Sequence, residues 1–148
     1  MERQTFEDIE VGTEYVSPGR TVTEADIVLF AGLSGDYSEL HTNAEFMRDH
    51  PFGQRIAHGL LGLAIQSGLA ARTLPPSAII GFLGLNNWNF RKPIFVGDTL
   101  YLRIVVHAKR VSASQPNRGV VTYWRSLVNQ RDEVVQDGEM ANLVECRG

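Results

Sequence analysis

The fold is decided by residues 60–73, which read Leu60-Leu61-Gly62-Leu63-Ala64-Ile65-Gln66-Ser67-Gly68-Leu69-Ala70-Ala71-Arg72-Thr73. This segment has almost no polar face, so it predicts a helix that is buried all round. Its glycines and alanines would let other backbones approach closely. The following Leu74-Pro75-Pro76 ends the helix, because proline cannot continue it. The rest of the chain is therefore expected to cover one long central helix.

The downstream half of the chain reads as β-sheet. Between residues 100 and 109, apolar residues alternate with mostly polar ones, which is the two-residue period of a strand. Further strands are predicted over residues 78–90, 120–129 and 134–145, the last two joined as a hairpin. A meander of long antiparallel strands with one buried helix indicates an α+β fold in which a curved sheet wraps the helix. Such a sheet has an edge that invites pairing with a second copy.

Shorter elements are expected upstream of the central helix. Residues 11–22 could hold a first strand, broken by Ser17-Pro18-Gly19. The stretch Thr23-Glu24-Ala25-Asp26 fits a capping box that opens a helix. The stretch Thr42-Asn43-Ala44-Glu45 is a second match and predicts a short helix that ends before Pro51.

Composition restricts the class of protein. The chain has 148 residues, 43% of them apolar and 21% charged, which is typical of a single globular domain over residues 1–148. A net charge of −3 without a basic cluster gives no reason to expect nucleic acid. The polar N-terminus, the shortness of the apolar run and the single Cys146 lead us to expect no signal peptide, no membrane span and no disulfide framework. A cytoplasmic protein is therefore expected.

The residues that suggest chemistry lie just before the central helix, in the stretches 35–41 and 52–59. Asp36 and His41 place a carboxylate and an imidazole close together in a short connecting segment. Gly59 stands at the start of the helix, where free N–H groups and partial positive charge suit a developing oxyanion. Such a pair beside a helix start can activate water and stabilise an enolate oxygen. These groups together could catalyse the addition of water to an unsaturated thioester.

These residues resemble the MaoC-like dehydratase family, which includes the (R)-specific enoyl-CoA hydratases. The resemblance covers nearly the whole chain and rests on Phe30–Asp36, His41, Arg55–Gly59, Ser67–Leu69 and Phe90–Asp98. It implies a hot-dog fold, a curved antiparallel sheet wrapped around a long central helix, assembled as a homodimer or a higher homo-oligomer. It also implies reversible hydration of a trans-2-enoyl thioester, such as an enoyl-CoA, to the (R)-3-hydroxyacyl thioester, with no cofactor.

The family's catalytic pattern is usually Asp-x-Asn-Pro-x-His, and this chain has Asp36-Tyr37-Ser38-Glu39-Leu40-His41. The resemblance makes Asp36 the general base, with a pKa that partial burial would raise, and His41 the group that orients the water or relays its proton. It makes the Gly59 backbone N–H the donor to the thioester oxygen. In the plainer alternative, Asp36 caps a turn, His41 is a solvated loop residue and Gly59 permits a tight turn.

Four further residues are assigned on the same resemblance. Ser67 matches a serine of the family motif and would support the Asp36 side, or it is a core serine bonded to its own helix. Arg91 and Lys92 would meet the coenzyme A phosphates, or they are surface cations without that role. His58 is expected to be a structural histidine.

Two other functions fit the same scaffold. An acyl-CoA thioesterase would act on the same kind of thioester, but the absence of Asp and Glu from residues 60–73 favours the hydratase arrangement. A non-catalytic acyl-thioester-binding protein or oligomer partner is the second rival, because Ser38 and Glu39 replace the usual Asn and Pro. No metal site is expected, since the histidines and the cysteine lack ligand spacing. The acyl chain, the carrier and the physiological direction stay open.

Overall fold

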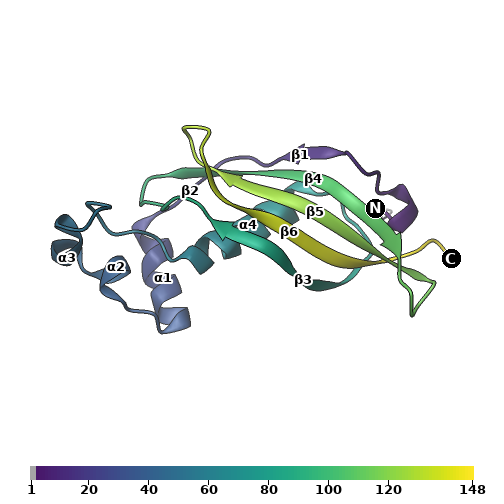
Figure 1. Cartoon of the computed structure of the whole chain (residues 1–148), viewed down its shortest axis with the longest axis horizontal. Helices are drawn as coiled ribbons and strands as arrows, with labels where there is room; N and C mark the ends of the chain where they lie inside the picture. Colours follow the sequence, from purple (N-terminus) through teal and green to yellow (C-terminus); the bar gives the residue numbers. More distant parts are fainter. Residues whose placement is uncertain (1–2) are drawn as a thin grey trace.

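The computed structural model describes residues 3–148 as a curved antiparallel sheet with one long helix against it and three short helices gathered at one end (Figure 1). In chain order, the elements are η1 (Phe6–Asp8), β1 (Glu14–Val16), β2 (Arg20–Thr21), α1 (Glu24–Ser34), α2 (Glu39–Thr42), α3 (Ala44–Arg48), α4 (Gly59–Thr73), β3 (Ile79–Phe90), β4 (Thr99–Val111), β5 (Arg118–Val128) and β6 (Val134–Glu145). The strand order is β1-β4-β5-β6-β3, with β2 also paired to β4. The predicted α+β fold is confirmed. Within residues 3–148, no helix combines the length and apolar character that crossing a bilayer requires.

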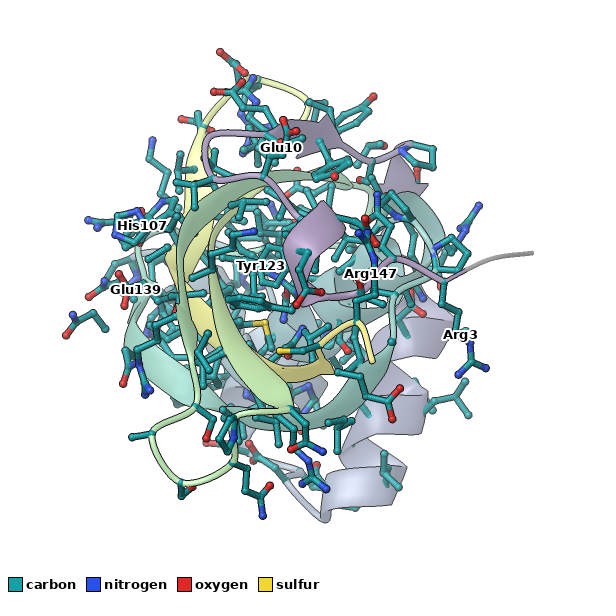
Figure 2. The ribbon with its side chains drawn as sticks, turned by 90° about the vertical axis from the view of Figure 1, so that its right-hand side faces the viewer. Arg3, Glu10, His107, Tyr123, Glu139 and Arg147 are labelled. Carbon is teal, nitrogen blue, oxygen red and sulfur yellow. The ribbon has the colours of Figure 1, made fainter. Side chains whose placement is uncertain are left out.

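The core lies between the inner face of the sheet and α4. Along the first half of β4, buried side chains alternate with more exposed ones, and Ile104 is fully buried. Leu69 of α4 belongs to the same buried cluster. Figure 2 shows the sheet curling around this interior, with Tyr123 inside the curl and His107 and Glu139 on its outer surface. The two-residue period read from the sequence therefore separates the core from the surface as predicted.

The prediction that the central helix is buried all round is wrong for this chain. Leu69 is buried, whereas Leu60 is 61% exposed. The sheet covers one side of α4 only, because β3 is an edge strand with no further strand beside it within residues 3–148. Phe82 and Leu83 of β3 are 55% and 53% exposed. The open side of α4 and the edge strand β3 thus line one largely apolar groove.

The caps of the short helices explain how the chain reaches the site. Thr23 caps α1 as predicted, since the Asp26 N–H donates to the Thr23 hydroxyl at 3.3 Å and the Thr23 N–H to the Asp26 carboxylate at 2.8 Å. The second predicted capping box is wrong. Thr42 ends the extra helix α2, and Asn43 caps α3 by accepting the Phe46 N–H at 2.9 Å. The sequence reading missed α2 because it is only one turn long.

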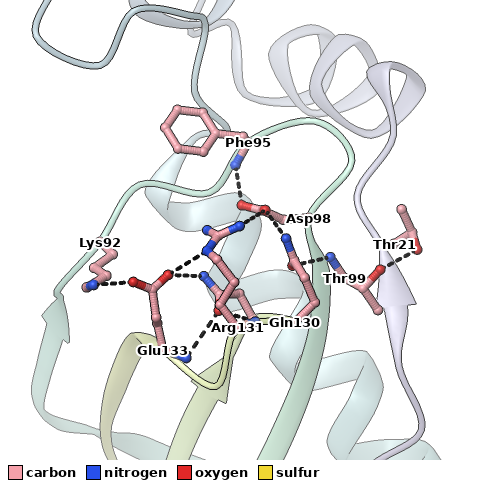
Figure 3. Close-up of polar contacts among 9 residues, drawn as sticks. Thr21, Lys92, Phe95, Asp98, Thr99, Gln130, Arg131 and Glu133 are labelled. Carbon is pink, nitrogen blue, oxygen red and sulfur yellow. Dashed lines mark hydrogen bonds and ion pairs between the residues drawn. The ribbon is translucent and has the colours of Figure 1, made fainter.

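A polar network ties the turn between β5 and β6 to the loop that follows β3 (Figure 3). Asp98 accepts the Phe95 N–H and the Gln130 side-chain amide, each at 2.9 Å. Glu133 binds Lys92, and hydrogen bonds from Asn129, Lys92 and Arg131 lower the pKa of Glu133 to about 2. The same loop also receives the Ala57 N–H on its Ile94 carbonyl at 2.7 Å. The segment that leads into α4 is therefore hydrogen-bonded to the loop that follows β3.

Candidate active site

Asp36 lies in the turn that ends α1. Gly35 closes the helix with φ 76°, a left-handed conformation that glycine adopts without strain. The Asp36 N–H donates to the Ser34 hydroxyl at 3.2 Å, and Asp36 Oδ1 accepts the Ser38 N–H at 3.1 Å. These local bonds fix one carboxylate oxygen and leave Oδ2 to face the next helix.

His41 is carried by α2 and is buried, with 7% of the residue exposed. Its Nδ1 lies 2.7 Å from the Ile56 carbonyl oxygen. Because a carbonyl oxygen only accepts, Nδ1 carries the hydrogen, and Nε2 of the neutral ring keeps its lone pair. That Nε2 lies 3.7 Å from Asp36 Oδ2. The structure thus brings together the two side chains that the sequence singled out.

His58 packs underneath this pair. Its ring stacks on the His41 ring with centroids 3.7 Å apart, and its Nε2 lies 2.9 Å from the Asp36 carbonyl oxygen. The Nε2–H therefore donates to the backbone of Asp36, while Nδ1 is buried without a partner within residues 3–148. His58 holds the Asp36 backbone and the His41 ring in place, which agrees with the structural role predicted for it.

Asp36, His41 and His58 offer ligand atoms within 4.8 Å of one another. The sequence did not suggest this cluster, because its spacing matches no metal-ligand motif and His58 comes from a separate segment. The hydrogen bond to the Asp36 carbonyl places an N–H on His58 Nε2, so that nitrogen has no lone pair for a metal. Hydrogen bonds thus occupy one side-chain atom of each residue, namely Asp36 Oδ1, His41 Nδ1 and His58 Nε2.

The expected rise in the pKa of Asp36 is wrong for this chain. The Ser38 N–H stabilises the ionised carboxylate and holds the pKa of Asp36 below its usual value. A protonated His41 or His58 would act in the same direction, more weakly. Burial cannot offset these effects, because the Asp36 side chain is 51% exposed. Asp36 is therefore a carboxylate at neutral pH.

Gly59 begins α4, as expected. Neither its N–H nor that of Leu60 has an acceptor within residues 3–148, as is usual for the first turn of a helix. The Gly59 carbonyl accepts the Gln136 side-chain amide at 2.9 Å, and Gln136 in turn accepts the Trp88 indole N–H at 3.2 Å. A Cβ at Gly59 would come within 2.9 Å of the Phe90 ring. The first turn of α4 is thus hydrogen-bonded to β6 through Gln136 and, within residues 3–148, has two free backbone N–H donors.

Arg91 and Lys92 lie beside the same turn. Both line a pocket of about 280 Å³ that also includes Gly59. Arg91 Nε binds the Asp137 carboxylate at 2.8 Å. Lys92 binds Glu133, as Figure 3 shows. Each side chain is 50% exposed, so part of each cation faces solvent.

Ser67 lies on the open side of α4, where it lines the groove of about 770 Å³ between α4 and β3. No hydrogen bond links its hydroxyl to Asp36 in the described part of the chain, and none returns to its own helix. The support that the resemblance assigns to Ser67 therefore stays a prediction.

Sequence reasoning missed Gln136 and Arg125. Arg125 occupies an inward position of β5, between Tyr123 and Leu127 in the alternation. Gln136 follows two valines in β6 and is 2% exposed. A charged or amide side chain at a position where the two-residue period demands an apolar one is the signal that could have found both.

Comparison of the chain with known proteins identifies its family. The model of the MaoC like domain matches residues 7–128, which include Asp36, His41 and Gly59. The chain belongs to the MaoC-like family. A relative from Rhodospirillum rubrum named (R)-specific enoyl-CoA hydratase is 35% identical over 144 residues, covering 97% of this chain and 93% of that protein.

Solved structures agree with the fold. A protein from Archaeoglobus fulgius described as a monoamine oxidase regulatory protein superposes with a TM-score of 0.93 at 35% identity, over 99% of this chain and 97% of that one. A Mycobacterium tuberculosis protein described as having a double hotdog fold gives a TM-score of 0.80 at 21% identity, over 98% of this chain and 45% of that one. This last likeness concerns the fold alone, and it confirms the predicted hot-dog architecture.

Proposed function

We propose that the protein catalyses the reversible hydration of a trans-2-enoyl thioester, carried by coenzyme A, to the (R)-3-hydroxyacyl thioester. The observation that carries this proposal is the 3.7 Å separation of Asp36 Oδ2 from His41 Nε2, together with the free N–H groups of Gly59 and Leu60 at the start of α4. Both atoms are acceptors at a distance too long for a direct hydrogen bond. One water molecule could donate a hydrogen bond to each of them. The name of the Rhodospirillum rubrum relative supports the same reaction.

The proposed reaction uses Asp36 and His41 on the water and Gly59 on the thioester. Substrate binding would cover the half-exposed Asp36 carboxylate, and that desolvation would raise its pKa and strengthen it as a base. The water gives its proton to Asp36 while its oxygen bonds to Cβ of the enoyl group. The enolate oxygen is held by the Gly59 N–H, and the proton then passes to Cα. The addition of water is redox-neutral, so the reaction consumes no oxidant or reductant.

The rival thioesterase reaction is disfavoured by the composition of α4. Helix α4 (Gly59–Thr73) carries no Asp or Glu, so it offers no carboxylate to the thioester carbon. A single experiment separates the candidates. Crotonyl-CoA is followed by loss of its enoyl absorbance, free thiol is assayed in parallel, and the chirality of the product is determined. Absorbance loss without thiol and with an (R)-product supports the hydratase; released thiol, an (S)-product or no turnover of short and medium chains contradicts it.

We also propose a homodimer formed through β3. The strand is an unpaired edge within residues 3–148 and exposes Phe82 and Leu83, the kind of edge that pairs with another chain. A second copy there would cover the groove between α4 and β3 and enclose the acyl chain. Light scattering together with activity on dilution tests this; a fully active monomer would contradict it.

A further inference from the structure

A buried cation without an acidic partner lies in the groove between α4 and β3. Arg125 of β5 is 5% exposed and lines that groove. Its Nη1 donates to Gln66 Oε1 at 3.0 Å, whereas its Nε is buried and has no partner. No carboxylate lies within ion-pair distance of it in residues 3–148. Burial lowers the pKa of Arg125 to about 10, so it stays charged at neutral pH.

This arrangement is unusual for a core. Buried charges are almost always paired, because a buried guanidinium with open donors has lost its water without full compensation. The neighbouring groups provide no counter-charge. Gln66 turns its amide N–H toward Met140 Sδ at 3.2 Å, and the Tyr123 ring lies 5.7 Å from the guanidinium. The planar Arg125 guanidinium is therefore free to bind an acceptor that enters the groove, and a carboxylate matches its geometry best.

The groove runs along α4 past this cation. Leu60, next to the Gly59 donor, lines one end, and Gln66 and Arg125 line it further along. Positions 59 and 66 lie about 10 Å apart along α4 at ~1.5 Å per residue. An extended chain advances roughly 1.2 Å per bond, so about eight bonds span this distance. The walls between are apolar, with Ala70 and Leu85 among them.

We propose that Arg125 binds a carboxylate at the far end of the acyl chain, so that the preferred substrates are enoyl thioesters of dicarboxylic acids. This inference rests on the proposed hydratase function and specifies its substrate class. A medium chain places the enoyl group at Asp36 and His41 while its terminal carboxylate reaches the guanidinium. Gln66 positions Arg125 by holding Nη1, and the remaining donors bind the carboxylate.

The test compares trans-2-octenedioyl-CoA with trans-2-octenoyl-CoA, which differ in the terminal carboxylate. The wild-type protein is expected to prefer the dicarboxylic substrate in kcat/KM by roughly 10- to 100-fold, the range expected for hydrogen bonds to a charged group. Arg125→Met should remove this preference, and Arg125→Lys should keep part of it. Arg103→Met is the matched control, since Arg103 pairs with Asp132 and is half-exposed on β4; it should leave the ratio unchanged.

Gln66→Glu is the second variant and does not remove a core side chain. It places a carboxylate against Arg125 Nη1, where the amide oxygen now lies at 3.0 Å. The preference should then collapse, because the cation is neutralised from within the protein. An arginine with only a structural role predicts no change in the ratio for this variant or for Arg125→Lys.

Two outcomes overturn the inference. The first is a wild-type protein that hydrates octenoyl-CoA as well as octenedioyl-CoA, and the second is a preference that survives Gln66→Glu. Calorimetric binding of the unreactive octanedioyl-CoA and octanoyl-CoA gives the same comparison without catalysis. Failure to hydrate any enoyl-CoA, together with tighter binding of octanedioyl-CoA, would reject the hydratase proposal and keep the Arg125 site.

Discussion

Replacement of Asp36 by asparagine separates catalysis from folding at this site. The amide oxygen of asparagine can still accept the Ser38 N–H that Asp36 Oδ1 accepts at 3.1 Å, so the turn after α1 should keep its shape. The side chain is 51% exposed, so little packing changes. What is lost is the oxygen that faces His41 and takes the proton from water. Loss of a general base lowers the rate by about 10²–10⁴-fold, and we expect that loss in kcat of Asp36→Asn.

The assay is steady-state hydration of crotonyl-CoA, with the thermal unfolding midpoint measured on the same samples. The unfolding midpoint should stay near that of the wild type. The matched control is Asp49→Asn, an exposed aspartate at the end of α3, which should change neither quantity. A folded Asp36→Asn protein whose kcat is within tenfold of the wild type would refute the role of Asp36.

The pH profile gives an independent check on Asp36. The Ser38 N–H lowers the pKa of Asp36 in the free protein. Because the carboxylate is the active form, kcat/KM should fall on the acid side, at a pH below the ordinary aspartate value of about 3.9. The acid limb of kcat, which reports the substrate complex, should lie at higher pH, since the bound substrate desolvates the carboxylate.

Three further predictions follow from the same geometry. His41→Ala should lower kcat by about 10²–10⁴-fold in the crotonyl-CoA assay with little change in binding, and a near-normal kcat in a folded variant would exclude His41 from the reaction. Gly59→Val places a side chain within 2.9 Å of the Phe90 ring and obstructs the Gly59 N–H donor. The activation free energy of hydration should rise by roughly 2.7–4 kcal/mol, and an unchanged kcat/KM would contradict the oxyanion role. The pKa of Glu133 is lowered to about 2, so the ionised side chain stabilises the fold fully at pH values above its unfolded pKa of about 4.3, and this stabilisation is lost as the pH falls toward 2. The free energies of unfolding of wild type and Glu133→Gln, measured in urea, should therefore differ at pH 7 and converge at pH 2. A difference that does not change with pH would refute this.

The sequence predicted the sheet well because its signal is local. Alternation of side chains in β4 and the cap at Thr23 depend on neighbours a few residues away, and both are confirmed. The burial of α4 was predicted wrongly, because the exposed fraction of its side chains depends on how far the sheet extends around the helix. That extent is set by where β3 ends the strand order, which no local pattern reveals.

In the candidate site too, features set by neighbouring residues were predictable, whereas features set by distant segments were not. The spacing of Asp36 and His41 was readable, but the pKa of Asp36 was misjudged because exposure is a tertiary property. His58 beneath them and Gln136 behind Gly59 could not be placed, since each contacts a residue on another segment. These distant contacts position the groups that the motif supplies.

The two halves of the site are attached to the protein in different ways. The first turn of α4 is bonded to the sheet through Gln136, and Ala57, in the segment before it, is bonded to Ile94 in the loop that follows β3. The Asp36 carboxylate is held mainly by its own turn, through Ser38. The proposed donor to the substrate oxygen is thus bonded directly to the sheet, whereas the Asp36 backbone is tied to the start of α4 through His58 and its carboxylate is oriented by its own turn. Changes at Ser38 and Glu39 can therefore alter the rate of proton transfer without disturbing where the thioester binds.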